Sequence, residues 1–171
     1  MPLRAGDRDL LEAGAREAAE AIMRLAHRES ARITAVDEEP MQAVIERLSP
    51  RAVVVGFTVS GGVDGRFALL LTDAAARVVA HAMVGGRHTQ APSDKLGKRM
   101  TAALTELGNI AASAFMNGVA EEVHRSCVPS VPEFASGDPA VVVPAALGGG
   151  SAVQVARLLI GDVEVELALA R

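Results

Sequence analysis

The chain has 171 residues, half of them apolar and 22% charged, with a formal net charge of −4. This apolar content excludes disorder over most of the length, and an acidic chain with 2% aromatic residues is not typical of a nucleic-acid-binding protein. The single cysteine, Cys127, excludes an internal disulfide and a cysteine-rich metal site.

The hydropathy pattern bears on where the protein works. Residues 1–9 are polar, and no apolar run approaches the roughly 18 residues that a transmembrane helix needs. The sequence therefore predicts neither a signal peptide nor a membrane partner, and favours a cytoplasmic protein.

The first part of the chain begins with a helix. Apolar residues recur at helical spacing over residues 9–29, which predicts a helix there. Residues 33–36 are typical of a short strand, which the acidic run at 37–40, closed by Pro40, is expected to end. Residues 41–48 fit a strand and a helix equally well.

A hairpin and a second helix follow. Two apolar runs, 52–59 and 66–71, flank a turn rich in Gly and Asp, which is the pattern of a β-hairpin. Thr72 or Asp73 is expected to cap a helix over residues 74–84, which Gly85 and Gly86 end. The polar segment 87–92 is the best candidate for a seam between two halves.

The second part opens with a long helix, expected from Ser93 or Asp94 to about His124. Three prolines then predict an extended segment, followed by strands over 140–143, 152–160 and 162–170. The last strand alternates regularly between apolar and polar residues. At the edge of a sheet it would suit a homodimer formed by strand addition.

This order predicts one helix-and-sheet unit used twice in a single domain spanning residues 1–171. The two halves cover about 9–87 and 93–171. The expected fold class is α/β in the loose sense, or α+β, with pseudo-twofold symmetry, an antiparallel sheet and the long helices packed on one face.

The long helix carries a polar stripe. At 100° per residue, seven side chains fall along one line: Lys95, Arg99, Glu106, Asn109, Ser113, Asn117 and Glu121. A solvated helix face alone would account for most of this stripe. Two features favour a site instead. Asn109 stands in mid-helix beside Gly108, which costs about 1 kcal/mol relative to Ala, and Glu106 and Asn109 project from one turn.

Residues 103–110 resemble the helix signature of the CheC/CheX/FliY phosphatases of bacterial and archaeal chemotaxis, and within that family their amino-acid sequence is more similar to CheC. The family motif is Asp or Ser, three residues, Glu, two residues, Asn, 22 residues, then Pro. Glu106, Asn109 and Pro132 match its last three positions with the full spacing. The surrounding order of elements from residue 52 to 171 also agrees.

The chain departs from the motif at two places. Ala102 stands at the Asp/Ser position. On the first helix, where many CheC proteins carry a second motif, one register pairs Glu12 with Ala15 and another pairs Glu17 with Glu20, so neither supplies an Asn. One intact site therefore remains, as in CheX.

The resemblance implies a hydrolase that accelerates loss of the aspartyl phosphate from a phosphorylated CheY-type receiver. Asn109 would position the attacking water, and Glu106 would pair with the receiver's lysine beside the phosphate. The protein would need no cofactor or metal of its own, because the receiver holds the Mg²⁺. A different class stays open: a non-catalytic docking protein that binds CheD, a receiver or the flagellar switch.

Basic residues precede the pair on the same helix. Lys95, Lys98 and Arg99 are more often a solvated face, but they could meet the acidic surface of a receiver. The glycine-rich segments 61–65 and 148–150 lack the context of a phosphate loop and are interpreted as turns.

Overall fold

The first half of the chain contains three helices and three strands in the computed structural model, which describes residues 4–85 and 96–171. The elements are α1 (Ala5–Leu25), β1 (Ala31–Pro40), α2 (Met41–Leu48), β2 (Ala52–Gly61), β3 (Gly65–Thr72) and α3 (Asp73–Met83). The predicted hairpin is confirmed. The predicted cap of α3 is confirmed as well, because the Ala75 N–H in the first turn donates a hydrogen bond to Thr72 Oγ1 over 3.1 Å. Helix α1 begins and ends four residues earlier than expected, and the undecided segment 41–48 is helical.

The acidic run at 37–40 does not end the first strand, contrary to the prediction. β1 continues to Pro40 because it pairs with a strand from the far end of the chain, from Asp37 opposite Val155 to Pro40 opposite Ala152. β1 is an edge strand, where a proline costs no ladder hydrogen bond on its open side. Non-local pairing thus overrides the local signal.

The second half contains α4 (Lys98–Val123), β4 (Cys127–Pro129), β5 (Glu133–Gly137), α5 (Pro139–Leu147), β6 (Ala152–Ile160) and β7 (Val163–Ala170). The extended segment and the final hairpin agree with expectation. The expected seam 87–92 and the expected helix start at Ser93 or Asp94 lie outside the described residues, as does Lys95.

The predicted strand at 140–143 is wrong, because these residues form the start of α5. Asp138 accepts a hydrogen bond from the Ala140 N–H over 2.9 Å, and Pro139 occupies the first helical turn. Both are helix-start signals that outweigh the strand propensity of the valines. Val142 and Val143 are buried against the sheet.

All seven strands form one antiparallel sheet with the order β1-β6-β7-β3-β2-β4, and β5 pairs with the same strand as β4. β7 lies in the interior between β6 and β3. The expected edge position of the last strand is therefore wrong, and β7 offers no open edge for strand addition.

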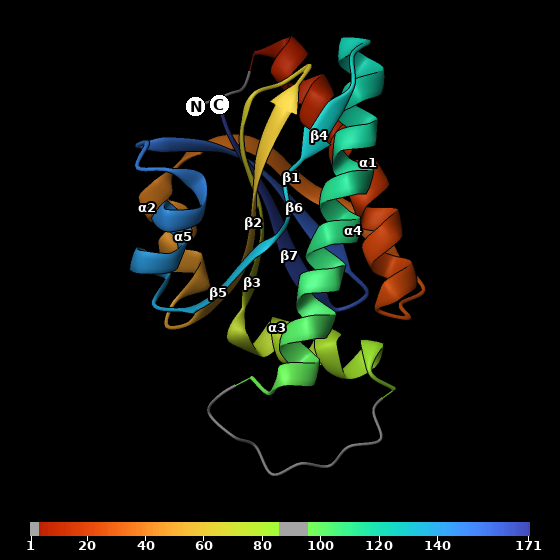
Figure 1. Cartoon of the computed structure of the whole chain (residues 1–171), viewed down its shortest axis with the longest axis vertical. Coiled ribbons are helices and arrows are strands. Elements are labelled where there is room, and N and C mark those ends of the chain that lie inside the picture. The colour runs from red at the N-terminus through yellow and green to blue at the C-terminus, as the bar shows by residue number, and fades with distance from the viewer. Residues whose placement is uncertain (1–3, 86–95) are drawn as a thin grey trace.

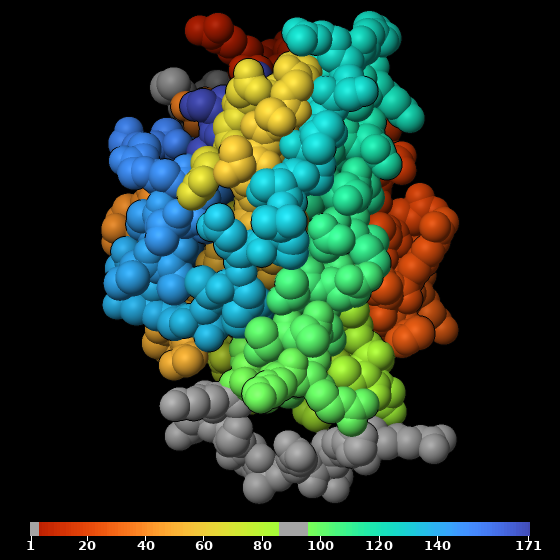
Figure 2. Space-filling view, viewed as in Figure 1, coloured from red at the N-terminus to blue at the C-terminus, as the bar shows by residue number. Residues whose placement is uncertain are grey.

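The helices form layers on both faces of the sheet (Figure 1). The two long helices α1 and α4 cover one face together with α3, as expected for the long helices, and the short helices α2 and α5 cover the other. Each face has its own aliphatic core. Figure 2 shows α4 and the segment 127–137 side by side on one surface of the molecule.

A partly buried ion-pair network ties α2 to the sheet. Arg47 donates two hydrogen bonds, of 2.7 and 3.0 Å, to the carboxylate of Glu166 in β7. Its Nη1 atom also lies 2.5 Å from Oε2 of Glu39 in β1. The hydrogen bond to Glu166 is the largest cause that raises the pKa of Arg47 above its ordinary value. Because Glu166 is only 7% exposed, this pairing compensates a carboxylate held inside the protein.

The two halves are interlocked. Strands of each half pair with the hairpin of the other half: β1 pairs with β6, and both β4 and β5 pair with β2. Helices α1 and α4 are both followed by a histidine in the left-handed conformation, His27 and His124. These positions differ by 97, which supplies an offset for comparing the two helices.

Candidate functional site

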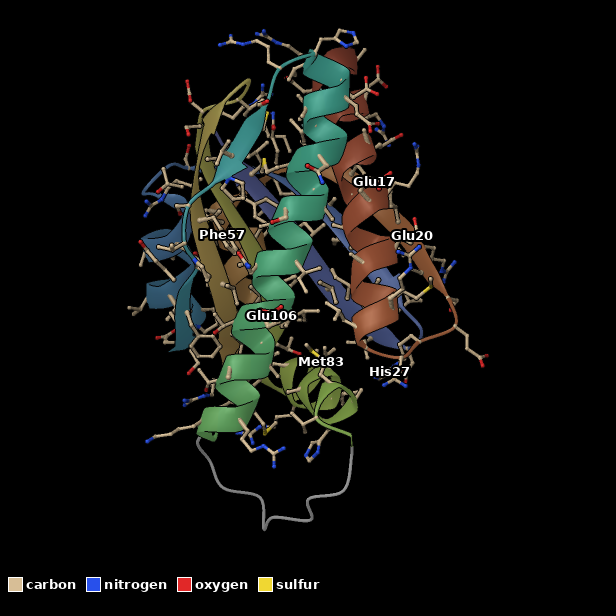
Figure 3. The ribbon with its side chains drawn as sticks, turned by 45° about the vertical axis from the view of Figure 1, so that its right-hand side comes forward. Glu17, Glu20, His27, Phe57, Met83 and Glu106 are labelled. Carbon is tan, nitrogen blue, oxygen red and sulfur yellow. The ribbon has the colours of Figure 1, made fainter. Side chains whose placement is uncertain are left out.

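The outer face of α4 presents the predicted polar stripe. Every described member is exposed: Arg99, Glu106, Asn109, Ser113, Asn117 and Glu121. Ala102, one turn before Glu106, is exposed as well, so the position at which the family motif has Asp or Ser lies on this surface. Leu104, Leu107 and Ala111 are fully buried on the opposite side. In Figure 3, Glu106 lies on α4, and Glu17 and Glu20 lie on the neighbouring α1.

Gly108 explains why this turn of α4 lies so close to the sheet. A Cβ atom at position 108 would be 2.5 Å from Cγ1 and 2.6 Å from Cβ of Val55 in β2. Ordinary contacts between carbon atoms are about 3.5–4.0 Å, so a side chain there would force the helix or the strand to move. The glycine that looked unfavourable for a helix therefore sets the position of Glu106 and Asn109.

Pro132 belongs to a link between β4 and β5 at the edge of the sheet. β4 pairs with β2 as far as Val59, and β5 resumes the pairing at Gly56. The link thus has three residues, 130–132, opposite two residues of β2, which is the count of a β-bulge. Because Pro has no N–H, it leaves no donor unpaired where β5 begins.

The offset of 97 identifies which residues of α1 correspond to the site on α4. It matches the buried residues of the two helices turn by turn, for example Leu10 with Leu107, Ala15 with Ala112 and Ile22 with Val119. It also matches exposed Asp9 with Glu106. Glu12, which is partly exposed, corresponds to Asn109.

This correspondence replaces both registers that the sequence suggested for the first helix. Ala15 is fully buried and could not present a side chain to a partner. The corresponding face of α1 is instead charged. Within it Glu12 pairs with Arg8 at 2.9 Å, and Glu20 pairs with Arg24. The face of α1 thus carries an acidic residue but no carboxamide at the position of Asn109.

Other features bear on possible ligands. Lys98 and Arg99 are exposed in the first turn of α4, two turns before Glu106. Over residues 4–85 and 96–171, no group of three His, Cys, Asp or Glu side chains is arranged to hold a metal ion. In the same residues no helix is both long and apolar enough to cross a membrane.

The solved structures that resemble this chain agree on its fold. No protein-family model and no curated protein matches the chain. Among solved structures, FliY from Thermotoga maritima is 19% identical with a TM-score of 0.75, covering 99% of this chain and 92% of that one. CheX in a complex with CheY, BeF₃ and Mg²⁺ from Borrelia burgdorferi is 17% identical with a TM-score of 0.64, covering 95% and 97%.

A further solved structure shares the fold. The middle domain of FliM from Vibrio alginolyticus is 10% identical with a TM-score of 0.64, covering 96% of this chain and 91% of that one. The chain therefore has the fold of CheX, FliY and FliM, and the resemblance suggested by the motif on α4 is confirmed at the level of the fold.

Proposed function

We propose that the chain is a phosphatase that accelerates hydrolysis of the aspartyl phosphate on a CheY-type receiver, with Glu106 and Asn109 as its working pair. The observation that carries this proposal is the pair itself. Both side chains are exposed and lie one turn apart on a helix that packs closely against the sheet. The helix is part of a chain with the fold of CheX and FliY.

Such a pair needs no nucleophile of its own. Phosphoryl transfer depends mainly on positioning and electrostatics. In the proposed step the oxygen of a water attacks the phosphorus in line, the bond from phosphorus to the aspartyl oxygen breaks, and the aspartate carboxylate is restored. Both protons of the water leave with inorganic phosphate, as H₂PO₄⁻.

Asn109 suits the positioning of that water. Its carboxamide oxygen accepts a hydrogen bond and does not titrate, so it orients the water without placing a charge beside the phosphate. Because Gly108 holds this turn on Val55, the carboxamide sits on a rigid part of the helix. A fixed group loses little entropy when it orders the water.

Glu106 is assigned to orientation of the complex. In the proposal its carboxylate pairs with the receiver's lysine beside the phosphate, as the family resemblance implies. The divalent cation belongs to the receiver, as the resemblance also implies; the complex of CheX with CheY contains Mg²⁺. Lys98 and Arg99 favour approach of an acidic receiver surface.

The test follows decay of the acyl phosphate on a phosphorylated CheY receiver with and without the protein. Asn109→Ala and Glu106→Ala are each expected to lower the acceleration of phosphate decay. For Asn109→Ala the expected loss is on the order of 10²–10³-fold, by analogy with the loss of one positioning donor. Asn117→Ala and Glu121→Ala are matched controls, since both residues are exposed on the same stripe. Equal activity in Asn109→Ala and wild type would contradict the proposed mechanism.

A docking function is the second candidate. It is favoured by the FliM middle domain, which has the same fold, and by the absence of an Asn at the corresponding position of α1. Under this candidate the protein binds a receiver, CheD or a switch component without accelerating hydrolysis. Binding of the receiver with no change in the decay of its phosphate would support it.

A further inference from the structure

Val131 is the most exposed large apolar side chain among the described residues. It is 80% exposed and lies in the link between β4 and β5, and Val128 in β4 is 58% exposed. Single exposed apolar residues are common on proteins. What distinguishes Val131 is where it stands and how it is held.

The link that presents Val131 is fastened to the sheet on its N-terminal side. The Ser130 N–H donates to the Thr58 carbonyl over 2.8 Å, and the Thr58 N–H donates to Ser130 Oγ over 2.9 Å. Pro132 restricts the backbone on the other side. The exposure of Val131 is therefore a property of an ordered backbone, and little entropy is lost when a partner covers it.

The link lies beside the candidate site. Two contacts relate α4 to β2: Gly108 lies against Val55, and Val123 lies against Gly62. From the first contact to the second, α4 advances by fifteen residues and the chain of β2 advances by seven. At about 1.5 Å per helical and about 3.3 Å per strand residue, both stretches span roughly 23 Å, so α4 and β2 run side by side in one direction. Thr58, opposite the link, is then level with about residue 114 of α4, roughly one turn beyond Asn109.

The first half shows that a valine is not needed to build this bulge. Its first strand has one extra residue at the corresponding place, where the register shifts between Ile33 and Ala35. That residue, Thr34, is 97 positions before Val131, and its hydroxyl donates to the Arg157 carbonyl over 3.1 Å. A polar side chain is therefore compatible with the bulge. The exposed valine occurs in the half that carries Glu106 and Asn109.

We infer that Val131 is a docking residue for the phosphorylated receiver, which it contacts through an apolar patch beside the phosphorylation pocket. This inference rests on the proposed function. Glu106 and Asn109 address the polar centre of the receiver, and Val131 covers apolar surface at its rim. Val131 takes no part in the chemistry and acts on binding alone.

The experiment measures both binding and turnover. Binding of a CheY receiver loaded with Mg²⁺ and beryllofluoride yields Kd, and decay of the acyl phosphate yields kcat and KM. Val131→Thr keeps the shape and copies the residue of the equivalent bulge. We expect it to raise Kd and KM on the order of tenfold, because apolar burial is lost, and to leave kcat unchanged. Val131→Ile is expected to retain wild-type values.

A control separates this effect from the loss of any exposed valine. Val141 is 64% exposed but lies on α5, which packs on the opposite face of the sheet from α4. Val141→Thr is expected to leave Kd, KM and kcat unchanged.

The outcomes distinguish the two proposals. Wild-type protein that binds the receiver without accelerating hydrolysis overturns the phosphatase, while the Kd of Val131→Thr still tests docking. Wild-type acceleration with no change of Kd or KM in Val131→Thr overturns docking alone. Sedimentation that shows a dimer lost in Val131→Thr assigns Val131 to a second copy of the chain and overturns its role toward the receiver.

Discussion

Gly108 of α4 and Val55 of β2 approach each other so closely that a Cβ atom at position 108 would lie 2.5 Å from Val55 Cγ1. Glu106 and Asn109 flank this glycine on the exposed side of the same turn. The contact therefore determines the height of the candidate pair above the sheet.

Gly108→Ala tests this relationship. Alanine improves helix propensity by about 1 kcal/mol, but overpacking a fitted contact costs about 1–3 kcal/mol, so a net loss of about 1 kcal/mol in the free energy of unfolding is expected. Relief of the clash displaces the turn by about 1 Å, and a misplacement of that size lowers a rate by on the order of 100-fold. Urea unfolding and the acyl-phosphate assay measure the two effects.

Gly6→Ala is the matched control for that substitution. Gly6 is also helical, in α1, and a Cβ there would meet nothing within 4 Å. It is expected to gain up to about 1 kcal/mol in stability with unchanged activity. A Gly108→Ala protein as stable and as active as wild type would contradict the positioning role of the glycine.

Local patterns predicted the parts of the fold that local forces decide. The hairpin of β2 and β3, the Thr72 cap of α3 and the exposed stripe of α4 all follow from turn residues, capping residues and periodicity. The candidate pair was found in the same way, because an Asn beside a Gly in mid-helix is unusual for a purely structural face.

Non-local pairing decided the rest. The strand β1 extends through an acidic run because β6, more than a hundred residues later in the chain, pairs with it as far as Pro40. β7 reads as an edge strand by its alternation, yet both β3 and β6 flank it. The exposed Val131 had no signal in the sequence, since its significance depends on the bulge that places it beside α4.

Asn109→Asp tests the chemistry proposed for the carboxamide. Asp has nearly the same shape, but its carboxylate is ionised at neutral pH and is repelled by the phosphoryl group. The acceleration of phosphate decay is expected to fall at least as far as in Asn109→Ala. Binding of the receiver without a phosphoryl group should change much less, and a variant with full acceleration would exclude a role for the neutral carboxamide.

Arg47→Met tests the partly buried ion-pair network. The change leaves Glu166, which is 7% exposed, without the guanidinium that it shares with Glu39. Removing the cation that pairs with the buried Glu166 carboxylate is expected to lower the free energy of unfolding by about 3 kcal/mol. Arg51→Met is the control, because its pair with Asp73 is exposed at the Arg51 side and 3.8 Å long; it should cost less than about 1 kcal/mol. Equal stability of both variants in urea would show that the network contributes little.

The correspondence between α1 and α4 can be tested by stability. In the register of Glu12 with Asn109, Glu12→Asn changes a partly exposed residue and loses one ion pair with Arg8, so a cost below about 1 kcal/mol is expected. Ala15→Asn would place an amide at a fully buried position, and an unpaired buried amide costs about 1–3 kcal/mol before any overpacking. The reverse order of stabilities in urea would contradict the register.

The same correspondence predicts how a second site is built. Asp9→Glu together with Glu12→Asn places the Glu and Asn of α4 at the equivalent positions of α1. The bulge beside them still carries Thr34 rather than a valine, so this new face is expected to bind a receiver weakly. Its contribution should therefore appear only at high receiver concentration, as a maximal rate per chain up to twice that of wild type. Adding Thr34→Val should bring the same increase at lower receiver concentration, because the apolar contact proposed for Val131 is then present on both halves. An unchanged maximal rate in the triple variant, with the protein folded, would mean that a Glu, an Asn and an exposed valine are not sufficient to make a site on this fold.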